Sequence, residues 1–390
     1  MAKKILFLFM LLLSLTGMLK AQVTTAGMSG KVMADEESVI GATVVAVHEP
    51  SGTSYGTVTN VDGRFSLQGM RSGGPYKVTV SYIGYQTAIY TGIQLQLGET
   101  YSLNVTLHEA SELLGEITIT ASKSKFSAEK TGATTNISSE QLTTLPSINR
   151  SISDFTRISP YASGNSFGGR DGRSNTFTVD GANLNNNFGL SSGLPGGGNP
   201  ISLDAIDEVQ VVIAPYDVRQ ANFIGAGINA ITKSGTNAYR GSAYMYFNNE
   251  VMRGNKIGDT DFGVRAEESK TVYGATFGGP IIKDKLFFFA NVEYEKSPQQ
   301  VITWRAAKEG ETPNNSTISR TTEADLAEFS QILKDKYGYN TGSFTDFPAD
   351  VTNLKLLGRI DWNINQGNKL SVRSVSYTHL RAHETSAHLV

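Results

Sequence analysis

Two groups of residues in this chain have types and spacings that could support chemistry. Gly225, Gly227 and Ala230 match the Gly-x-Gly-x-x-Ala fingerprint of dinucleotide sites. That chemistry requires a strand before the glycines and a helix after them, so that the helix N-terminus faces the pyrophosphate. Residues 229–233 are instead rich in β-branched types and lead into a Ser-Gly pair, which predicts a strand. We therefore assign no nucleotide cofactor.

The histidines near the C-terminus form the second group. His379, His383 and His388 mimic the spacing of metal ligands, but they do not form the His-Glu-x-x-His motif of zinc enzymes, and we assign no metal site. His48 with Glu49 is an isolated pair at the end of a predicted strand, where we expect a surface histidine. Because no nucleophile–base pair or pair of carboxylates stands out, the sequence predicts a protein that is not an enzyme.

The composition favours a β protein of more than one domain. A length of 390 residues predicts roughly two to three folding units at ~150 residues each. Charged residues make up 18% of the chain, against ~25% in ordinary soluble domains, and glycine, phenylalanine and tyrosine number 40, 18 and 16. Because 34 basic residues balance 36 acidic ones, no large basic surface for nucleic acid is expected. The absence of cysteine excludes disulfides and thiolate metal sites.

The first residues have the pattern of a secretory signal. Lys3 and Lys4 form a basic region, residues 5–13 are apolar, and small or polar residues lead to Ala21. The apolar stretch is shorter than the ~20 residues that span a bilayer, so we predict a signal peptide over residues 1–21 rather than an anchor. No later stretch resembles a spanning helix, and a membrane-embedded mature chain would have to be a β-barrel.

Residues 24–108 are predicted to form a β-sandwich, because roughly six or seven short strand-like runs follow one another between turn residues. Two of these runs, residues 53–59 and 64–70, flank the pair Asp62-Gly63. This pair predicts a hairpin, since glycine accepts the positive φ of the turn. Three motifs resemble the carboxypeptidase regulatory-like (transthyretin-like) domain: Val39–Val44, Thr59–Phe65 and Val80–Tyr85. The resemblance implies no peptidase, because this region has no cluster of metal-ligating residues.

Residues 115–236 are predicted to form an α+β domain. Ser138 and Gln141 form a capping-box pattern that starts a short helix, which Pro146 stops, and a second helix is expected over residues 147–158. The loops that follow are long and rich in glycine and asparagine, a composition that also suits a flexible linker. Two predicted strands favour a compact domain instead: residues 176–179 and 209–213.

Four motifs of this domain, in chain order, resemble the plug of TonB-dependent outer-membrane receptors. They are Gly169-Arg170, Val179-Asp180-Gly181, Ile206–Val211 and Gly225–Gly235. The plug-motif residues within them are Gly169, Arg170, Asp180, Gly181, Gly225, Gly227, Asn229 and Thr232. Many siderophore receptors carry a Gly-Pro and a Tyr-Gly where this chain has residues 214–220, and these residues instead resemble an Oar-like subgroup. We therefore do not infer that this chain binds iron chelates.

Residues 238–377 change to long amphipathic strands of ~10 residues, the length that transmembrane barrels require. One apolar row is Leu286, Phe288, Ala290, Val292 and Tyr294, on the parity opposite to Asn291, Glu293 and Glu295. Another is Leu354, Leu356, Ile360, Trp362 and Ile364, which alternates with Lys355, Arg359, Asp361 and Asn363. A soluble sandwich would alternate as well. Tight turns at 283–285 and 366–368 and long polar segments at 250–268 and 297–352 favour an outer-membrane barrel.

The barrel is predicted to be incomplete, because about five strands fit here and a barrel that holds a plug needs ~22. The alternation ends near Ser376, and residues 376–390 are predicted to be a non-native tail. The predicted fold is therefore mainly β. It comprises an N-terminal β-sandwich, an α+β plug domain and the first strands of a truncated antiparallel transmembrane β-barrel.

A candidate for a TonB box lies at the start of the predicted plug domain, and its residues are Glu116, Ile117, Thr118, Ile119, Thr120 and Ala121. An extended β-rich peptide can pair with a partner strand through backbone hydrogen bonds, which can bear a pull. The other reading of this segment is a structural strand that links two domains.

The receptor resemblance implies a transporter of the bacterial outer membrane, with the sandwich and the TonB box in the periplasm. Its implied partners are TonB with its proton-driven inner-membrane complex, outer-membrane lipid and an unidentified large solute. The alternative is a surface adhesin or binding module without transport. We expect Arg170 and Asp180 to hold the plug against wall charges such as Arg240, Glu293 or Arg359.

Overall fold

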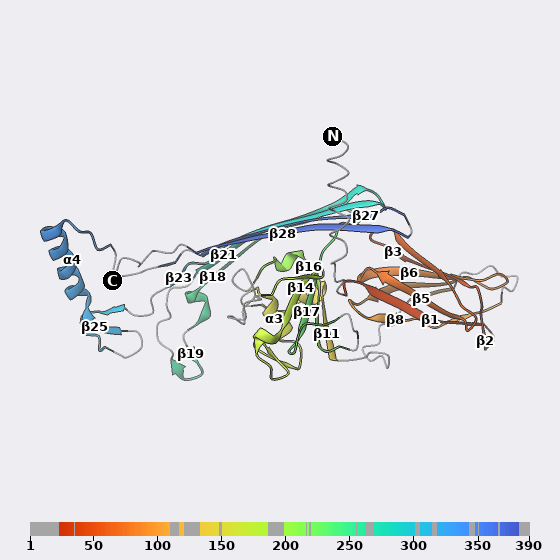
Figure 1. The fold of residues 1–390 in the computed structure, drawn as a ribbon, viewed down its shortest axis with the longest axis horizontal. Helices are drawn as coiled ribbons and strands as arrows, with labels where there is room; N and C mark the ends of the chain where they lie inside the picture. The colour runs from red at the N-terminus through yellow and green to blue at the C-terminus, as the bar shows by residue number, and fades with distance from the viewer. Residues whose placement is uncertain are drawn as a thin grey trace, which may run out of the picture. The chain divides into compact units, whose positions relative to one another are not determined.

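The computed structural model is shown in Figure 1. The residues that it describes are 23–34, 36–109, 117–120, 133–147, 150–185, 199–215, 217, 220–254, 256–261, 269–300, 305–313, 318–342, 348–349, 351–365 and 367–381. The predicted signal peptide, Glu116, Ala121, His383 and His388 lie outside them. The chain divides into two compact units. One comprises Met1–Gly241, Thr276–Asn291 and Leu357–Val375, and the other comprises Ser242–Ala275, Val292–Leu356 and Ser376–Val390.

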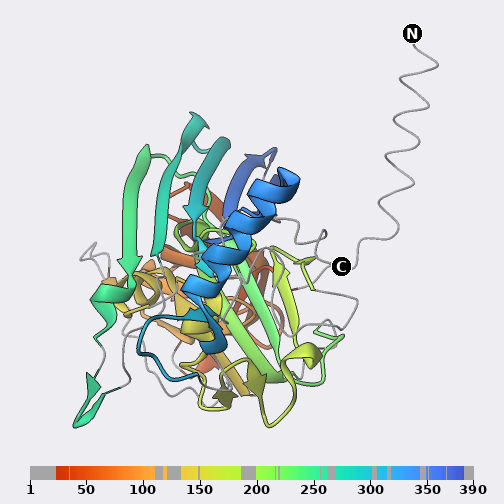
Figure 2. The ribbon, with the colours of Figure 1, turned by 90° about the vertical axis from the view of Figure 1, so that its left-hand side faces the viewer.

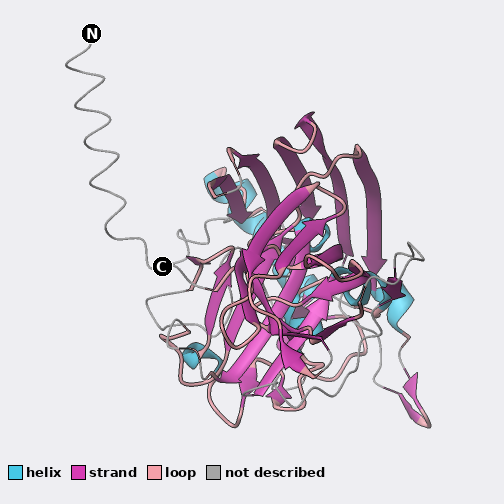
Figure 3. Cartoon of the chain, turned by 90° about the vertical axis from the view of Figure 1, so that its right-hand side faces the viewer, coloured by secondary structure: helices cyan, strands magenta, loops and turns pink. Residues whose placement is uncertain are grey.

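Strands make up most of the secondary structure, as Figure 3 shows, and this confirms the predicted mainly β fold. The α-helices are α2 (Ser139–Thr144), α3 (Ile152–Thr156) and α4 (Glu323–Tyr337), and the 3-10 helices are η2 (Gly172–Ser174), η3 (Leu203–Ala205) and η4 (Glu250–Arg253). Within the described part of the chain, no helix has the length and apolar character needed to cross a bilayer.

The N-terminal region contains two five-stranded sheets. In the first, β1 (Ala26–Ala34) pairs with β2 (Glu37–Ser38), β5 (Arg64–Met70), β8 (Thr100–Ser102) and β9 (Val105–Leu107). The second has the order β10 (Ile117–Thr120), β7 (Ala88–Leu95), β6 (Gly73–Ser81), β3 (Thr43–His48) and β4 (Thr53–Val58).

The two sheets share one apolar core. Along β6 the side chains of Tyr76, Val78 and Val80 are completely buried, whereas Lys77 between them is exposed. Met28 of β1 in the other sheet belongs to the same cluster of buried residues. Burying each such side chain stabilises the fold by roughly 1.5–3 kcal/mol, so the alternating pattern fixes which face of each strand points inward.

The predicted hairpin at Asp62-Gly63 is wrong. Strands β4 and β5 form as expected, but they belong to different sheets, so the turn carries the chain from one sheet to the other. The Asn60 side chain accepts hydrogen bonds from the backbone N–H groups of Asp62 and Arg64. Gly63, at φ +70°, accepts from the N–H of Val32 in β1 at 2.8 Å. The backbone polar groups of the turn are therefore hydrogen-bonded to the Asn60 side chain and to β1, and not to a paired strand of a hairpin.

The expectation that His48 lies on the surface is also wrong, because its residue is only 5% exposed. Its ring lies 5.0 Å from that of Tyr76, and its Nδ1 is 2.7 Å from the Ser51 hydroxyl oxygen. The chain folds back over the strand end through Ser51 and Thr53, which are buried as well. This burial lowers the pKa of His48 to about 3, so the imidazole is neutral in the folded protein.

The region predicted to be a plug, residues 115–236, forms a second β region, and we keep the name plug for it. Its sheet has the order β11 (Ala133–Ser138), β16 (Ile206–Ala214), β17 (Gly227–Thr232), β14 (Thr176–Val179) and β15 (Ala182–Asn183), and β12 (Ala162–Ser163) pairs with β13 (Ser166–Phe167). The predicted capping box of Ser138 and Gln141 starts α2. The second helix is shorter than expected, because Ser151 and Asp154 form a capping box that starts α3 at Ile152.

The long strands of the C-terminal region form one five-stranded sheet, in agreement with the predicted number. Its order is β18 (Arg240–Asn249), β21 (Ser269–Ile282), β22 (Leu286–Lys296), β27 (Val351–Asn363) and β28 (Lys369–Arg381). Figure 2 shows these strands side by side. We call this sheet the wall. The short strands between its members are β19 (Lys256–Ile257), β20 (Thr260–Asp261), β23 (Gln299–Gln300), β24 (Arg305–Ala307), β25 (Ile318–Thr322) and β26 (Pro348–Ala349).

The side chains of the wall show the opposite exposure from those of a soluble sheet, because apolar ones are exposed and polar ones are buried. On β22, Val292 and Tyr294 are exposed, whereas Glu293 is only 4% exposed. On β27, Leu356 is 43% exposed and Lys355 is 4% exposed. A sheet with apolar side chains outside and polar ones inside suits a wall whose outer face meets hydrocarbon.

Strand β28 continues to Arg381, past the position where the tail was predicted to begin. The rest of that predicted tail, residues 382–390, lies outside the described residues, so its origin stays a prediction.

We predict that Leu356→Arg destabilises the folded wall by roughly 2–4 kcal/mol, the cost of an arginine on the lipid face near the bilayer midplane. The measurement is a denaturant titration of the protein refolded in lipid vesicles. Phe329→Arg is the matched control, because Phe329 lies on α4 and is 58% exposed. Equal stability of the two variants would contradict a lipid-facing row.

Candidate functional site

A buried group of charges joins the plug to the wall within the first unit. We call it the ionic cluster, and its members are Arg71, Asp180, Arg359, Asp361 and Arg373 with the hydroxyl residues Thr232, Ser234 and Ser371. Asp180, Thr232 and Ser234 come from the plug, and Arg359, Asp361, Ser371 and Arg373 come from β27 and β28. Arg71 comes from the sandwich, between β5 and β6.

Asp180 is positioned by the tight turn between β14 and β15. Asp180 and Gly181 adopt φ values of 49° and +84°, which a two-residue loop of this hairpin requires. Because β14 runs parallel to β17, the turn lies beside Thr232. The Asp180 carboxylate accepts from the Thr232 backbone N–H at 3.0 Å and from its hydroxyl at 2.6 Å. Asp180 is therefore a fixed, buried negative charge at the end of the plug sheet.

Two arginines of the wall face this carboxylate. The Arg359 guanidinium lies 3.7 Å from Asp180 and donates to the Thr232 carbonyl oxygen at 2.6 Å. Arg373 lies 3.5 Å from Asp180, and its guanidinium also donates to the Asp180 backbone carbonyl. Arg359 also donates hydrogen bonds from its Nε and Nη2 groups to the Asp361 carboxylate, at 2.9 and 3.0 Å. A forked guanidinium can thus hold plug and wall groups at the same time.

Asp361 carries the rest of the cluster. It accepts hydrogen bonds from the hydroxyl groups of Ser234 on the plug and Ser371 on β28. Arg71 donates to Ser234 and lies 3.4 Å from Asp361. Arg71, Arg359 and Arg373 thus share two carboxylates, those of Asp180 and Asp361.

The positive charges of Arg71 and Arg359 also act on Asp207 of β16. Burial raises the pKa of Asp207 above its usual range, against the opposing effect of Arg71.

Apolar contacts accompany the ionic cluster. Phe289 of β22 and Leu357 of β27 are buried in the plug core, where they join Phe177 and Val209. Val375 of β28 packs against the same core. The wall thus meets the plug through apolar residues as well as through the paired charges of the ionic cluster.

The sandwich makes further polar contacts with the wall. The Asn363 amide donates to the Thr53 hydroxyl at 2.9 Å, and the Asn237 N–H donates to the Pro50 carbonyl at 2.8 Å. The Lys369 ammonium lies 3.2 Å from the centre of the Tyr55 ring, a cation–π contact. The sandwich is thus fastened at several points along the turns of the wall.

One loop of the sandwich contacts the plug sheet. The Leu97 N–H donates to both carboxylate oxygens of Glu208 at 3.1 Å, and its carbonyl accepts from the Gln210 amide. The Asn136 amide donates to Glu99 at 3.1 Å. Burial raises the pKa of Glu208 to about 7, although the hydrogen bond from Leu97 favours the charged form. Glu208 is thus able to change its charge near neutral pH.

The other plug-motif residues lie in the plug itself. Gly169 adopts φ +75°, and the Arg170 N–H donates to the Phe167 carbonyl at 3.0 Å. The Asn229 side chain accepts from the Thr178 hydroxyl at 2.6 Å.

Gly225 and Gly227 lie close to neighbouring side chains, which would have to shift to admit a Cβ. A Cβ at Gly225 would lie 2.3 Å from the Asn175 amide oxygen, and one at Gly227 would lie 2.6 Å from the Phe223 ring. These glycines are followed by strand β17 instead of a helix, so the context of a dinucleotide site is not met.

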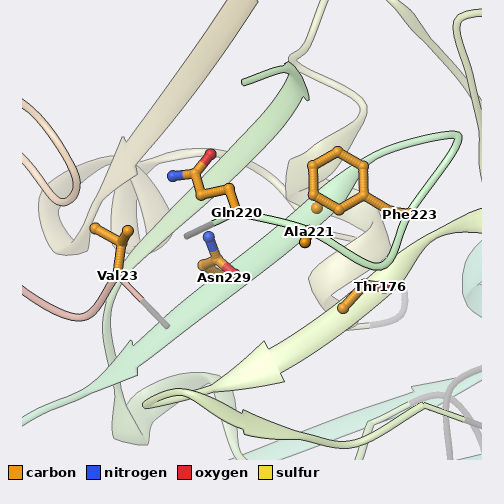
Figure 4. Close-up of a pocket in the computed structure, with 7 residues that line it drawn as sticks. Val23, Thr176, Gln220, Ala221, Phe223 and Asn229 are labelled. Atoms are coloured by element: carbon orange, nitrogen blue, oxygen red, sulfur yellow. The ribbon is translucent and has the colours of Figure 1, made fainter. Parts of the chain in front are cut away.

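A small hollow lies beside β17, as Figure 4 shows. Its cavity volume of about 10 Å³ is far below the ~300–1,000 Å³ of ligand pockets. Its lining residues are Val23, Thr176, Gln220, Ala221, Phe223, Gly227 and Asn229. The described residues contain no group of three or more His, Asp or Glu side chains that could hold a metal ion.

The structure brings together some of the residues named from the sequence and separates others. Asp180 meets Arg359, as was expected of a plug–wall pair. Glu293 instead pairs with Lys355 at 2.8 Å in the second unit and accepts from the Tyr244 hydroxyl at 2.8 Å. Arg170 lies in a plug turn, and Arg240 is an exposed residue at the start of β18.

Sequence reasoning missed several members of the site, namely Arg71, Glu208, Ser234, Ser371 and Arg373. Ser234 and Glu208 lie within recognised plug motifs and could have been found there. Arg71 had no local signal, because its partners are distant in sequence.

The TonB-box candidate lies on the sandwich. Its residues Ile117–Thr120 form β10, which pairs in parallel with β7.

Two family models match parts of this chain. The family model described as carboxypeptidase regulatory-like domain matches residues 27–108, and that described as outer membrane beta barrel domain matches residues 231–389. The chain is 25% identical over 334 residues to the TonB-dependent transporter Oar of Myxococcus xanthus. This match covers 80% of this chain and 30% of Oar.

One similar solved structure is that of the siderophore receptor PirA from Acinetobacter baumannii, with 20% sequence identity and a TM-score of 0.39. The match covers 64% of this chain and 32% of the PirA chain. Another is the outer membrane transporter YddB from Escherichia coli, with 14% identity and a TM-score of 0.40. This match covers 63% of this chain and 33% of the YddB chain. The chain thus spans about a third of the length of these proteins.

We predict that Asp180→Asn loosens the attachment of the plug to the wall. Removing one partner of a buried ion pair typically costs about 3–5 kcal/mol, because the remaining charges stay buried. The measurement is vancomycin sensitivity of cells that carry the complete receptor, which should rise. Asp171→Asn is the control, because Asp171 and Arg173 form an exposed plug pair with 55% of each side chain accessible. Unchanged sensitivity in Asp180→Asn would show that this pair does not hold the plug.

We also predict that raising the pH weakens the contact between sandwich and plug. The pKa of Glu208 rises from 4.5 to about 7 on folding, so its contribution to stability is complete below pH 4.5 and is lost as the pH rises through 7. The loss amounts to about 3 kcal/mol. The melting temperature of the purified protein should therefore fall between about pH 5 and pH 8.

Glu208→Gln should flatten this pH dependence, since an amide oxygen still accepts from Leu97 without a charge. Glu140→Gln on the exposed face of α2 is the control and should leave the profile unchanged. A profile that is equally steep in both variants would assign the pH dependence to another group.

Proposed function

Because this chain belongs to the TonB-dependent receptors of the outer membrane, we propose that it forms part of a transporter that moves a large solute through a plugged β-barrel. The energy would come from the inner-membrane proton gradient through TonB. The observation that best supports the proposal is the ionic cluster, in which Asp180 of the plug faces Arg359 and Arg373 of the wall.

A transporter needs a plug that seals the barrel and can also move. An apolar core alone would seal it, but separating apolar surfaces exposes them to water. Ion pairs and hydrogen bonds can be exchanged for hydration when water enters, so their net cost of rupture is smaller. The paired charges around Asp180 and Asp361, beside the apolar contacts of Phe289 and Leu357, suit both requirements.

Moving the plug requires work from outside the chain. The sequence contains no Gly-x-x-x-x-Gly-Lys phosphate loop that would bind a nucleotide. A partner that pulls on an extended segment is the remaining source, and the β10 segment Ile117–Thr120 lies near the start of the plug domain, ahead of β11 in the chain. Backbone pairing between this segment and a strand of TonB would supply the grip.

We predict that Ile119→Pro abolishes binding of the purified periplasmic domain of TonB to the complete receptor. Proline removes a backbone donor that a paired strand requires. The measurement is a binding titration with receptor in detergent, together with the amount of receptor in the outer membrane, which should not change.

Glu309→Pro is the matched control for this substitution. Glu309 lies in the turn of residues 308–311, where the Glu311 N–H bonds to the Lys308 carbonyl and Gly310 has φ +81°, so proline is tolerated there. If Ile119→Pro binds TonB as tightly as the control, the segment is a structural linker. If no form of the receptor binds TonB, an adhesin or binding module without transport is the better reading.

A further inference from the structure

We propose that the edge strand β7 of the sandwich is a binding site for the TonB-box candidate, and that a strand of TonB adds to the outer edge of the docked β10. This inference rests on the proposed function for the identity of the partner. The sandwich and the box would then form one composite edge, in which the box is already extended when the partner arrives.

The pairing of β10 with β7 is specific in register. Four residue pairs align in parallel, from Ile117 opposite Ala88 to Thr120 opposite Thr91. The partner strand β7 has β6 on its other side, so its free edge is the one that β10 occupies. An uncovered edge strand presents a row of unpaired N–H and C=O groups, and the box covers this row.

The length of the site follows from the shape of β7. Gly92 comes directly after the last paired residue and adopts φ +77°. At this point the register between β6 and β7 also shifts, from Tyr90 opposite Val78 to Ile93 opposite Tyr76. A bulge of this kind bends a strand and ends regular pairing on its edge. The site therefore accepts about four residues, which matches the alternating Ile-Thr-Ile-Thr segment.

The docked segment keeps one edge available. In the sheet order β10-β7-β6-β3-β4, β10 is the terminal strand, and no described strand pairs with its outer edge. An extended partner strand can add there and continue the sheet by one strand. Holding the segment extended in advance removes part of the ordering entropy that binding would otherwise cost.

The site is also anchored. Leu97 lies two residues beyond the end of β7 and bonds to Glu208 of the plug strand β16. Arg71 of the same sandwich reaches Ser234 and Asp361 in the ionic cluster. The docked box is thus held by a domain that is itself fastened to the plug and the wall.

A disulfide tests the docking directly, because the chain contains no cysteine of its own. Thr91→Cys combined with Thr120→Cys places two thiols on register partners, whose Cα atoms are ~4.8 Å apart in neighbouring strands, within disulfide range. Thr91→Cys combined with Thr118→Cys is the matched control, because a shift of two residues separates the Cα atoms by ~8 Å. The in-register pair should cross-link readily in the complete receptor and the control pair should not. Equal yields would overturn the docking site.

The same disulfide then tests the composite edge. The oxidised in-register variant should bind the periplasmic domain of TonB at least as tightly as the reduced form, because no described strand occupies the outer edge of β10. A loss of about tenfold or more on oxidation, reversed by reductant, would show that the box must leave β7 and would overturn the proposal. A receptor dimer that forms through this edge without TonB would overturn it in favour of a second copy as occupant.

The two proposals can fail separately. If wild-type receptor does not bind TonB, the proposed function and the composite edge fail, while the cross-linking yield still decides whether β7 holds the box.

Discussion

The arrangement of this chain depends on one constraint, which is that the wall strands place their polar side chains on the protein side. Glu293, Lys355 and Asp361 are buried there, while Leu356 and Trp362 on the other face are exposed. A buried charge is tolerated only when it is paired or hydrogen-bonded, so each polar wall residue demands a partner. Lys355 finds its partner within the wall, in Glu293, whereas Asp361 also needs Ser234 of the plug and Arg71 of the sandwich. The inverted pattern of the wall thus requires polar partners from the plug and the sandwich at Asp361, beside the apolar contacts of Phe289 and Leu357.

The sequence predicted those features whose signal is local. The alternation of β22 and β27 showed which side chains are apolar, and the capping box of Ser138 and Gln141 located α2. The Asp62-Gly63 turn was misread because a turn signal tells where the chain reverses but not which strand it pairs with next. Tertiary contacts with β1 decided that question.

Other features were missed because their causes are distant or were overlooked. Burial of His48 depends on a loop that closes over it, and the role of Arg71 depends on wall residues almost three hundred positions away. Helix α4, seen in Figure 2, lies within residues 297–352, which were expected to form a long polar connection between wall strands. It did have a local signal, since Thr322 and Asp325 form a capping box at its start and Gly338 ends it in the left-handed conformation.

The sandwich occupies a special position in this scheme, because a single strand of it connects two sites. Residues Ala88 to Thr91 of β7 pair with the TonB-box candidate, and Leu97, just after the same strand, bonds to Glu208 on the plug sheet. Residues in a paired strand open less readily than those in a loop, so ordered structure links the two contacts. Since Glu208 follows Asp207, which lies in the field of Arg71 and Arg359, the path continues to the ionic cluster without leaving packed structure. If a partner pulls on the box, as proposed, the pull can reach the plug through the sandwich as well as through the chain that connects them.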